Sequence, residues 1–452
     1  MIVLTAFFVE VGTDDFIYGR GDKPLFLLGI YSYAIQNTLA TSPHLCYNKP
    51  TLKNKFGNKI ELLAPAGDFS LLKTAFYFGA DAVYLGGKEF SLRAKSGNFS
   101  EEEITEAVMY THALGKKLYV TVNIFARNND FEKIKEYALF LEKAGVDAVI
   151  ISDLGVLKIF RSLTNLEIHI STQANVCNSY AATQYVELGA NRIILARELP
   201  IQDISEICNV LSGKADIEVF VHGAMCISYS GRCLMSKYMT GRDANRGDCA
   251  HPCRYKYALQ EEKRPGEFFS VEEDSNGTYI MNSRDLCLID KLNELADAGI
   301  ASFKIEGRMK NEYYVGGVVN AYRRAMNGEK FDYIAELEKL PHRPFTTGFT
   351  FNDQHKEFEK SAASISNYQV VAVVIENSQD ITIQKLPDSI EVQIRIKNKI
   401  ITGDEIEILS SSAYNGKTFV FNGETVSIPE QIVSINCPYK LEACDILCKK
   451  VR

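Results

Sequence analysis

The sequence lacks several features that would assign it to common functional classes. No apolar run is long enough to cross a membrane and no positively charged segment opens the chain, so neither a membrane span nor a secretory signal is expected. The net charge of −7 gives no overall basic surface, so any contact with nucleic acid needs a local patch. The HExxH and GxSxG motifs of peptidases and hydrolases are also absent. We expect a cytoplasmic protein without a recognisable peptidase signature.

Short β-branched runs alternate with amphipathic stretches of helical length from Lys59 onward, which is the pattern of a parallel sheet with crossover helices. Eight strands are expected, at KIELLAP, DAVYLGG, KLYVTVN, DAVIISD, IHIST, NRIILA, IEVFVHG and SFKIEGR. Helices are expected between most of them, including residues 69–78, 101–114, 131–144 and 179–188. Eight such units predict a (β/α)8 TIM-like barrel, in which active sites lie at the carboxyl ends of the strands.

The chain divides into three predicted parts. Residues 1–57 show no clean period and form a poorly specified N-terminal extension. Residues 58–340 form the barrel, with a cysteine-rich insertion (223–300) on the catalytic face. Near its end a strand-like segment, 278–286, leads into an expected helix, 286–298. Residues 341–452 contain short strands of period two and predict a small C-terminal β-barrel or sandwich.

The cysteines are odd in number, eleven in all, which does not suit the disulfide framework of a small secreted domain. Four of them fall in one stretch of the insertion: Cys226, Cys233, Cys249 and Cys253. Four thiolates suit a tetrahedral zinc ion or an iron–sulfur cluster, and the spacing leaves the metal undecided. Disulfides and unlinked buried thiols are the alternatives. A second run, Cys437, Cys444 and Cys448, is expected to be structural or at most a secondary metal site.

Polar side chains gather at the predicted strand ends, where they can point into the barrel mouth. Those that follow strands in this way are Asn123, Gln173, Asn175, Glu198, His222, Lys304, Glu306 and Arg308. We take His222, Glu306 and Lys304 as candidates for catalysis, although a histidine in this position is as often a satisfied barrel residue. Glycines near the first strands, such as Gly67 and Gly86, either admit a ligand or serve a tight turn.

The insertion also carries a local excess of basic residues interleaved with tyrosines. The residues concerned are Arg232, Lys237, Arg242, Arg246, Arg254 and Lys256, with Tyr229, Tyr238, Tyr255 and Tyr257. Guanidinium groups bind phosphates or carboxylates, and tyrosines stack on unpaired bases. The alternative is a solvated loop whose arginines balance the charge of a thiolate-bound cluster.

Several segments together resemble the peptidase U32 family, also called collagenase-like proteases. They are ELLAPAGDFSLLKTAFYFGADAVYLG, NIFARNND, STQANV, HGAMCISYSGRCLMSKY, DCAHPCR and SFKIEGRMKNEYYV. The resemblance runs from about residue 59 to residue 348, and the β-rich tail resembles the family's C-terminal domain. The length with one such domain is most similar to the group of tRNA hydroxylation protein P.

This resemblance implies a function that composition and spacing do not show. Members of that group form 5-hydroxyuridine at the tRNA wobble position with prephenate, others modify a cytidine of ribosomal RNA, and relatives hold a 4Fe-4S cluster on four cysteines. It implies that the four cysteines of the insertion bind such a cluster and that arginines meet the dicarboxylate prephenate. The candidate arginines are Arg93, Arg197, Arg242, Arg246 and Arg308, with Asn123, Gln173 and Asn175 as further substrate contacts.

The implied partner is the anticodon loop of a tRNA, and a paralogous U32 subunit is a second one. Three alternatives stay open: a collagenase-like peptidase, a hydroxylation protein for a ribosomal RNA cytidine, and a non-catalytic scaffold that senses redox state. The peptidase alternative lacks an activated nucleophile or a metal-bound water with a recognisable signature.

Overall fold

The computed structural model describes residues 52–92, 97–226, 228–255, 284–351, 366–375 and 390–451. It also describes four two-residue strands: β8 (Leu259–Gln260), β9 (Phe268–Phe269), β10 (Glu273–Asp274) and β11 (Gly277–Thr278). Arg93 and most of the predicted N-terminal extension lie outside the described residues. Residues 52–57 of that extension contact the barrel, since Asn54 Nδ2 donates to the carbonyl oxygens of Gly299 and Ile300.

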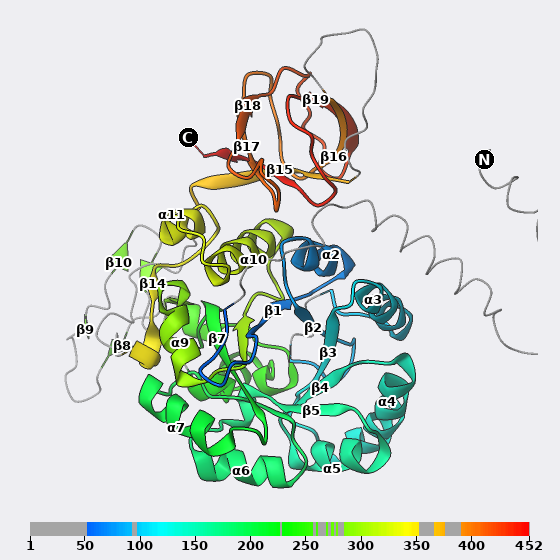
Figure 1. Ribbon diagram of the computed structural model, residues 1–452, viewed down its shortest axis with the longest axis vertical. Coiled ribbons are helices and arrows are strands. Elements are labelled where there is room, and N and C mark those ends of the chain that lie inside the picture. Colours follow the sequence, from blue (N-terminus) through cyan, green and yellow to red (C-terminus); the bar gives the residue numbers. More distant parts are fainter. Residues whose placement is uncertain are drawn as a thin grey trace, which may run out of the picture. The chain divides into compact units, whose positions relative to one another are not determined.

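Eight parallel strands close into a barrel, so the predicted TIM-like fold is confirmed (Figure 1). They are β1 (Glu61–Pro65), β2 (Ala82–Gly86), β3 (Lys117–Val122), β4 (Ala148–Ile151), β5 (Glu167–Ile170), β6 (Arg192–Ile194), β7 (Asp216–Ala224) and β13 (Ser302–Ile305). Each strand pairs in parallel with the next, and β13 closes the ring by pairing with both β7 and β1. The carboxyl ends of all eight strands therefore meet at one mouth.

Helices follow the strands around the outside of the ring. They are α2 (Phe69–Tyr77), α3 (Glu101–Ala113), α4 (Phe131–Ala144), α5 (Leu154–Leu163), α6 (Ser179–Glu187), α7 (Ile201–Leu211), α9 (Leu292–Ala298) and α10 (Glu312–Met326), with α11 (Tyr333–Glu338) after them. Local sequence fixes several ends: Asp68 and Ser100 accept hydrogen bonds from first-turn amides, and Gly145 ends α4 in the left-handed conformation. None of the described helices is both long and apolar enough to span a membrane.

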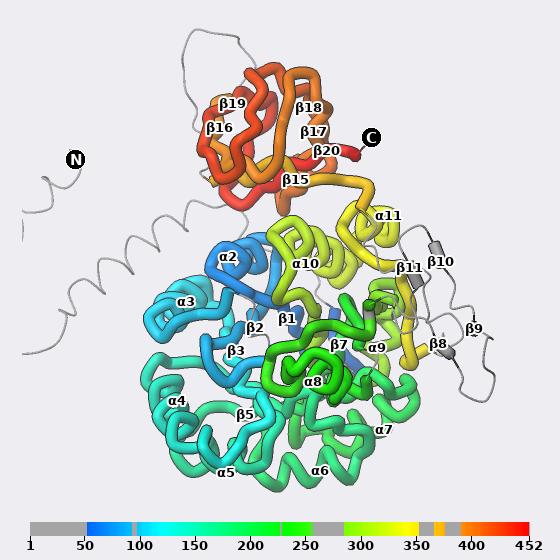
Figure 2. The backbone as a smooth tube through the Cα atoms, turned by 180° about the vertical axis from the view of Figure 1, so that it is seen from behind, coloured from blue at the N-terminus to red at the C-terminus, as the bar shows by residue number. Residues whose placement is uncertain are grey.

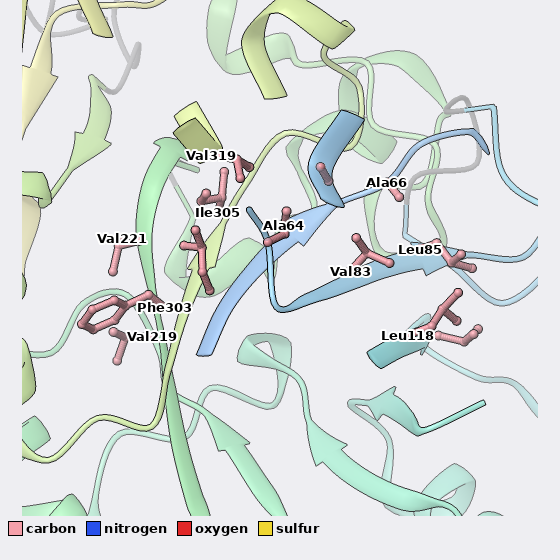
Figure 3. Packing of buried hydrophobic residues seen from close by; sticks show 14 of the residues in the cluster. Ala64, Ala66, Val83, Leu85, Leu118, Val219, Val221, Phe303, Ile305 and Val319 are labelled. Carbon is pink, nitrogen blue, oxygen red and sulfur yellow. The ribbon is translucent and has the colours of Figure 1, made fainter. Parts of the chain in front are cut away.

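Strand residues alternate between the inside of the barrel and the helices. Leu62 and Ala64 of β1 belong to the large core between strands and helices, which Figure 3 shows with Val83, Phe303 and Val319. A smaller apolar cluster fills the inside of the barrel, and it contains Leu63, Ala82, Tyr84, Tyr119, Ala148, Ile150 and Ile194. The barrel is therefore a packed core, and ligands have access only at its mouth.

The insertion after β7 begins and ends at the same place. β12 (Asp285–Cys287) pairs antiparallel with the end of β7, so that Asp285 faces Ala224, and β14 (Phe345–Thr346) adds to β12. A helix starting at residue 286 was the wrong prediction, because residues 285–287 use their backbone groups in this ladder and α9 begins only at Leu292. A buried ion pair between Arg343 and Asp285, 2.6 Å long, holds β12 in place.

The C-terminal β domain is also confirmed as an antiparallel sheet with the order β18-β17-β20-β15-β16-β19. Its strands are β15 (Tyr368–Val374), β16 (Ile390–Ile396), β17 (Glu405–Leu409), β18 (Thr418–Val420), β19 (Ile432–Cys437) and β20 (Ile446–Lys450). β20 was not predicted, although it lies in the middle of the sheet and pairs with β15 and β17. The Tyr77 hydroxyl of α2 donates to Asp445 just before β20, at 2.6 Å.

Candidate active site and cysteine-rich loop

A pocket at the barrel mouth brings together side chains from the ends of most strands. Six of its lining residues were predicted from the sequence: Asn123, Gln173, Arg197, Lys304, Glu306 and Arg308. Apolar walls come from Tyr84, Ile150, Ile194 and Phe220, while Thr121, Ser171 and Thr172 add hydroxyl groups. An apolar pocket with a few convergent polar groups at this end of a barrel is the expected form of a small-molecule site.

Arg308 is a buried cation that lines this pocket, with 5% of its surface exposed. Its Nη1 donates to the hydroxyls of Ser91 and Thr121, both at 2.8 Å, and its Nη2 donates to Asn98 Oδ1 at 3.3 Å. These partners are neutral groups, and they fix the plane of the guanidinium. A Cβ at Gly86 would lie 2.7 Å from Nη1, so this glycine makes room for the arginine.

Lys304 lines the pocket from below and is held by a carboxylate inside the barrel. Its Nζ lies 2.8 Å from Glu218 Oε1 and 4.3 Å from the centre of the Tyr84 ring. Burial lowers the pKa of Lys304, and although burial alone would raise the pKa of Glu218, Lys304 and Arg192 lower it to about 2. We regard this pair as ionised, because two cations surround one fully buried carboxylate.

His222 lies in the core beside the mouth rather than among the residues that line the pocket. Its ring packs near Tyr314, Tyr322 and Phe345, and its Nδ1 lies 3.4 Å from the Tyr322 hydroxyl. Burial lowers the pKa of His222 to about 3, so the ring is neutral near pH 7. Its catalytic role remains a prediction that these contacts do not support.

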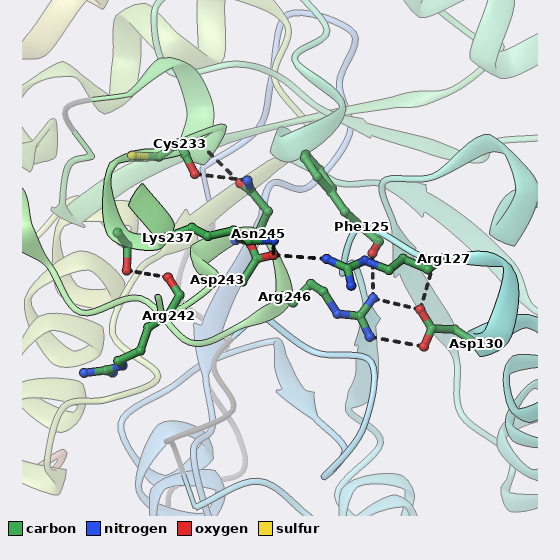
Figure 4. Close-up of polar contacts among 10 residues, drawn as sticks. Phe125, Arg127, Asp130, Cys233, Lys237, Arg242, Asp243, Asn245 and Arg246 are labelled. Atoms are coloured by element: carbon green, nitrogen blue, oxygen red, sulfur yellow. Dashed lines mark hydrogen bonds and ion pairs between the residues drawn. The ribbon is translucent and has the colours of Figure 1, made fainter. Parts of the chain in front are cut away.

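The cysteine-rich loop (residues 225–255) is fastened to the barrel rim by ion pairs and hydrogen bonds, several of which appear in Figure 4. Arg246 donates to Asp130 through both Nη1 (2.8 Å) and Nη2 (3.1 Å), and also to the Phe125 carbonyl oxygen. Arg127 pairs with Asp243 at 3.4 Å. The Arg246 guanidinium lowers the pKa of Asp130, which keeps the pair charged.

Other residues predicted to bind substrate hold the loop together instead of lining the pocket. Arg242 pairs with Asp248 at 2.8 Å and donates to the Cys249 carbonyl oxygen. Asn175, which adopts a left-handed conformation, donates to the Tyr229 carbonyl oxygen at 3.1 Å. Arg242, Arg246 and Asn175 therefore act on the shape of the loop in this structure.

The four cysteines of the insertion sit on segments that are tied to one another. Asn245 exchanges hydrogen bonds with the backbone of Cys233, and Ser236 Oγ accepts from Ala250 N beside Cys249. The short helix α8 (Met235–Thr240), which follows Cys233, contacts the turn at Pro252–Arg254 that contains Cys253. Figure 2 shows α8 over the ring of strands.

None of these four cysteines is buried. Cys226 is exposed and the other three are half-buried. The sulfurs of Cys233 and Cys249 each accept a backbone hydrogen bond at 3.3 Å, from Met235 N and His251 N. Among the described residues, no group of three or more His, Cys, Asp or Glu side chains has the arrangement needed to hold a metal ion.

Sequence comparison assigns this architecture to a family, because the model of peptidase family U32 matches residues 67–360. The chain belongs to the U32 family. An uncharacterized protease of Methanocaldococcus jannaschii is 42% identical over 70% of this chain and 80% of its own length. The tRNA hydroxylation protein P of Escherichia coli is 36% identical over 78% and 86%, and a 23S rRNA 5-hydroxycytidine synthase of the same species is 37% identical over 60% and 40%.

Proposed function

We propose that this U32 protein is an RNA-modifying enzyme that hydroxylates the wobble uridine of tRNA, with prephenate as co-substrate and an iron–sulfur cluster on the cysteine-rich loop. The observation that carries the proposal is the placement of a pocket with two arginines at the barrel mouth, beneath a loop (Figure 2) with four cysteines, one exposed and three half-buried. Its support from relatives is the similarity to tRNA hydroxylation protein P over most of both chains.

The pocket suits a small dicarboxylate because its cations are already oriented. Arg308 is fixed by Ser91, Thr121 and Asn98, while Arg197 is held over the Phe220 ring at 5.0 Å and donates to the Ala224 carbonyl oxygen. Planar guanidinium groups held in this way bind carboxylates through paired hydrogen bonds. Glu306 lines the same pocket, and its carboxylate would hold or move a proton during the reaction.

The cysteine-rich loop has the donor set that a 4Fe-4S cluster needs, four cysteine thiols, although their sulfurs are not gathered into a metal-binding group in the described part of this structure. Cys226, Cys233, Cys249 and Cys253 would hold it, and the backbone amides that already donate to two of the sulfurs would stabilise thiolates. When bound, the cluster would supply electron transfer. The chain itself contributes Arg242, which donates to the Cys249 carbonyl oxygen and would offset negative charge there.

The outer face of the loop suits an unpaired RNA strand. Tyr238 on α8 is 92% exposed and Leu234 one turn earlier is 72% exposed, although large apolar side chains of this kind are ordinarily buried. Arg232 and Lys237 lie on the same segment, which gives it positive charge on an acidic protein. Stacking on exposed aromatic rings beside cations is the usual mode of binding single-stranded RNA.

The proposal is tested by deleting the gene, together with any paralogue, and measuring tRNA and ribosomal RNA nucleosides by mass spectrometry. We expect loss of 5-hydroxyuridine derivatives from tRNA and recovery on complementation with the wild-type gene. Loss of 5-hydroxycytidine from ribosomal RNA instead would show that the enzyme hydroxylates a ribosomal RNA cytidine. Unchanged RNA together with cleavage of gelatin by the purified protein would replace the proposal with a peptidase.

A further inference from the structure

One carboxylate at the barrel mouth is bonded to the segment that joins two of the cysteines. Glu198 follows β6 and comes directly after Arg197, which lines the pocket. Its two carboxylate oxygens accept hydrogen bonds from Ser230, one from the backbone amide at 2.5 Å and one from the side-chain hydroxyl at 2.6 Å. Ser230 lies between Cys226 and Cys233 in sequence, and only 1% of its surface is exposed.

The backbone at Ser230 needs such support because it is strained. Its φ of 41° is in the left-handed region, which residues other than glycine, asparagine and aspartate seldom adopt. Positions of this kind persist only where the surroundings hold them, and they concentrate at functional sites. The two short hydrogen bonds that Ser230 donates to one carboxylate are charge-assisted, and such bonds are stronger than those between neutral groups.

Two further bonds join the same segment to the residues after β5. Asn175 donates to the Tyr229 carbonyl oxygen at 3.1 Å, and Arg232 Nε donates to the Gln173 carbonyl oxygen at 3.1 Å. Gln173 lines the pocket. The pocket wall and the segment between the first two cysteines are therefore connected through residues 229, 230 and 232.

We propose that Glu198 is a positioning residue that holds residues 229–232 against the pocket wall and thereby sets where Cys226 and Cys233 stand over the barrel mouth. Ion pairs on Asp130 and Asp243 hold the later half of the loop, between Cys233 and Cys249, so Glu198 governs a different half. The effect on the segment is independent of the proposed function, whereas the effect on cluster uptake rests on it.

The first test uses the protein without any cluster. The rate of trypsin cleavage after the exposed Arg232 reports how often residues 229–232 detach from the pocket wall. The fragments are measured by mass spectrometry. We expect Glu198→Ala to speed this cleavage about tenfold or more, the change that loss of one charge-assisted hydrogen bond produces. Glu198→Gln, which keeps one acceptor, should lie between Glu198→Ala and the wild type.

A matched control exists on α4, far along the chain from this site. Glu142 Oε1 accepts from the backbone amide of Asn165 at 2.7 Å and from its side-chain amide at 3.2 Å, so this carboxylate also binds both the backbone and the side chain of one residue. Glu142→Ala should leave cleavage after Arg232 unchanged. Equal cleavage in wild-type protein and Glu198→Ala, or equal acceleration by Glu142→Ala, would overturn the positioning role.

The second test measures iron and sulfide per chain after anaerobic reconstitution, with the visible absorption spectrum. We expect Glu198→Ala to hold less than half of the wild-type iron and Glu198→Gln to recover most of it. Wild-type iron in Glu198→Ala would refute the link between this carboxylate and the cysteines. A wild-type protein that takes up no iron would refute the proposed cofactor, while the cleavage test would still decide the positioning role.

Discussion

The two groups of cysteines in this chain, those of the β domain and those of the insertion, differ in their surroundings. In the C-terminal β domain Cys437 and Cys448 are buried and Cys444 is half-buried, and burial raises the pKa of the Cys437 thiol to about 11 and those of Cys444 and Cys448 to about 12. The cysteines of the insertion are exposed or half-buried in a polar loop. A thiol must lose its proton to bind iron, so only the second environment suits a metal. Burial separates structural cysteines from reactive ones where sequence spacing does not.

The largest expected effect comes from replacing one cysteine of each group. We expect Cys249→Ala to abolish iron uptake and RNA hydroxylation, because a ligand set that loses one thiolate cannot complete a four-cysteine site. Cys448→Ala should keep both and lower the free energy of unfolding by only about 1–2 kcal/mol, through the small cavity it leaves. Equal iron contents in the two purified variants would contradict the comparison.

A second comparison sets Arg308, which lines the pocket, against Arg242, which holds the loop. Lysine cannot reproduce a paired guanidinium contact, so Arg308→Lys should weaken prephenate binding by about ten- to a hundredfold in calorimetric titration. Arg242→Lys should change this affinity little. A similar loss of prephenate affinity in both variants would show that the pocket around Arg308 is not the prephenate site.

His222 should affect stability and not the chemistry. Its pKa in the folded protein, about 3, lies below the ordinary value, so the unfolded chain takes up a proton that the folded chain refuses as the pH falls below about 6.5. This contribution to stability is full above pH 6.5 and is lost toward pH 3. Between pH 6 and pH 5, urea unfolding of the wild type should lose about 1 kcal/mol more than that of His222→Gln.

The same variant also decides whether His222 takes part in catalysis. Folded His222→Gln should retain hydroxylation activity, because the ring is not among the residues that line the pocket. Loss of activity without loss of stability would restore the catalytic role predicted from the sequence.

The smallest expected effect concerns the exposed ring on α8. Tyr238→Ala should weaken binding of an anticodon stem-loop about tenfold, the low end of what one stacked base contributes. Ile428→Ala is the control, since Ile428 is also a largely exposed apolar residue, at 64%, but belongs to the β domain. Fluorescence anisotropy with labelled RNA measures both, and equal affinities would move the RNA site away from α8.

The barrel could be predicted from the sequence because its strands repeat one local pattern, an apolar run followed by a glycine-capped helix. β12 was predicted only in part: the strand-like segment 278–286 covers its first two residues, but Leu286 and Cys287 precede a helix and look like its first turn. The side chains at strand ends were predicted because strand ends share one mouth, and five of the eight do line the pocket. The partners of the predicted residues could not be predicted. Asp130 pairs with Arg246, which is 116 positions away in the sequence, and no local sequence pattern indicates such a pair.

The central claim is that the thiols of the cysteine-rich loop hold an iron–sulfur cluster over the arginine-containing pocket. Anaerobic purification of the wild-type protein, followed by iron and sulfide analysis with an absorption spectrum, tests it most directly. The account predicts about four iron and four sulfide per chain. Fully active protein that contains zinc alone, or no metal, would contradict it.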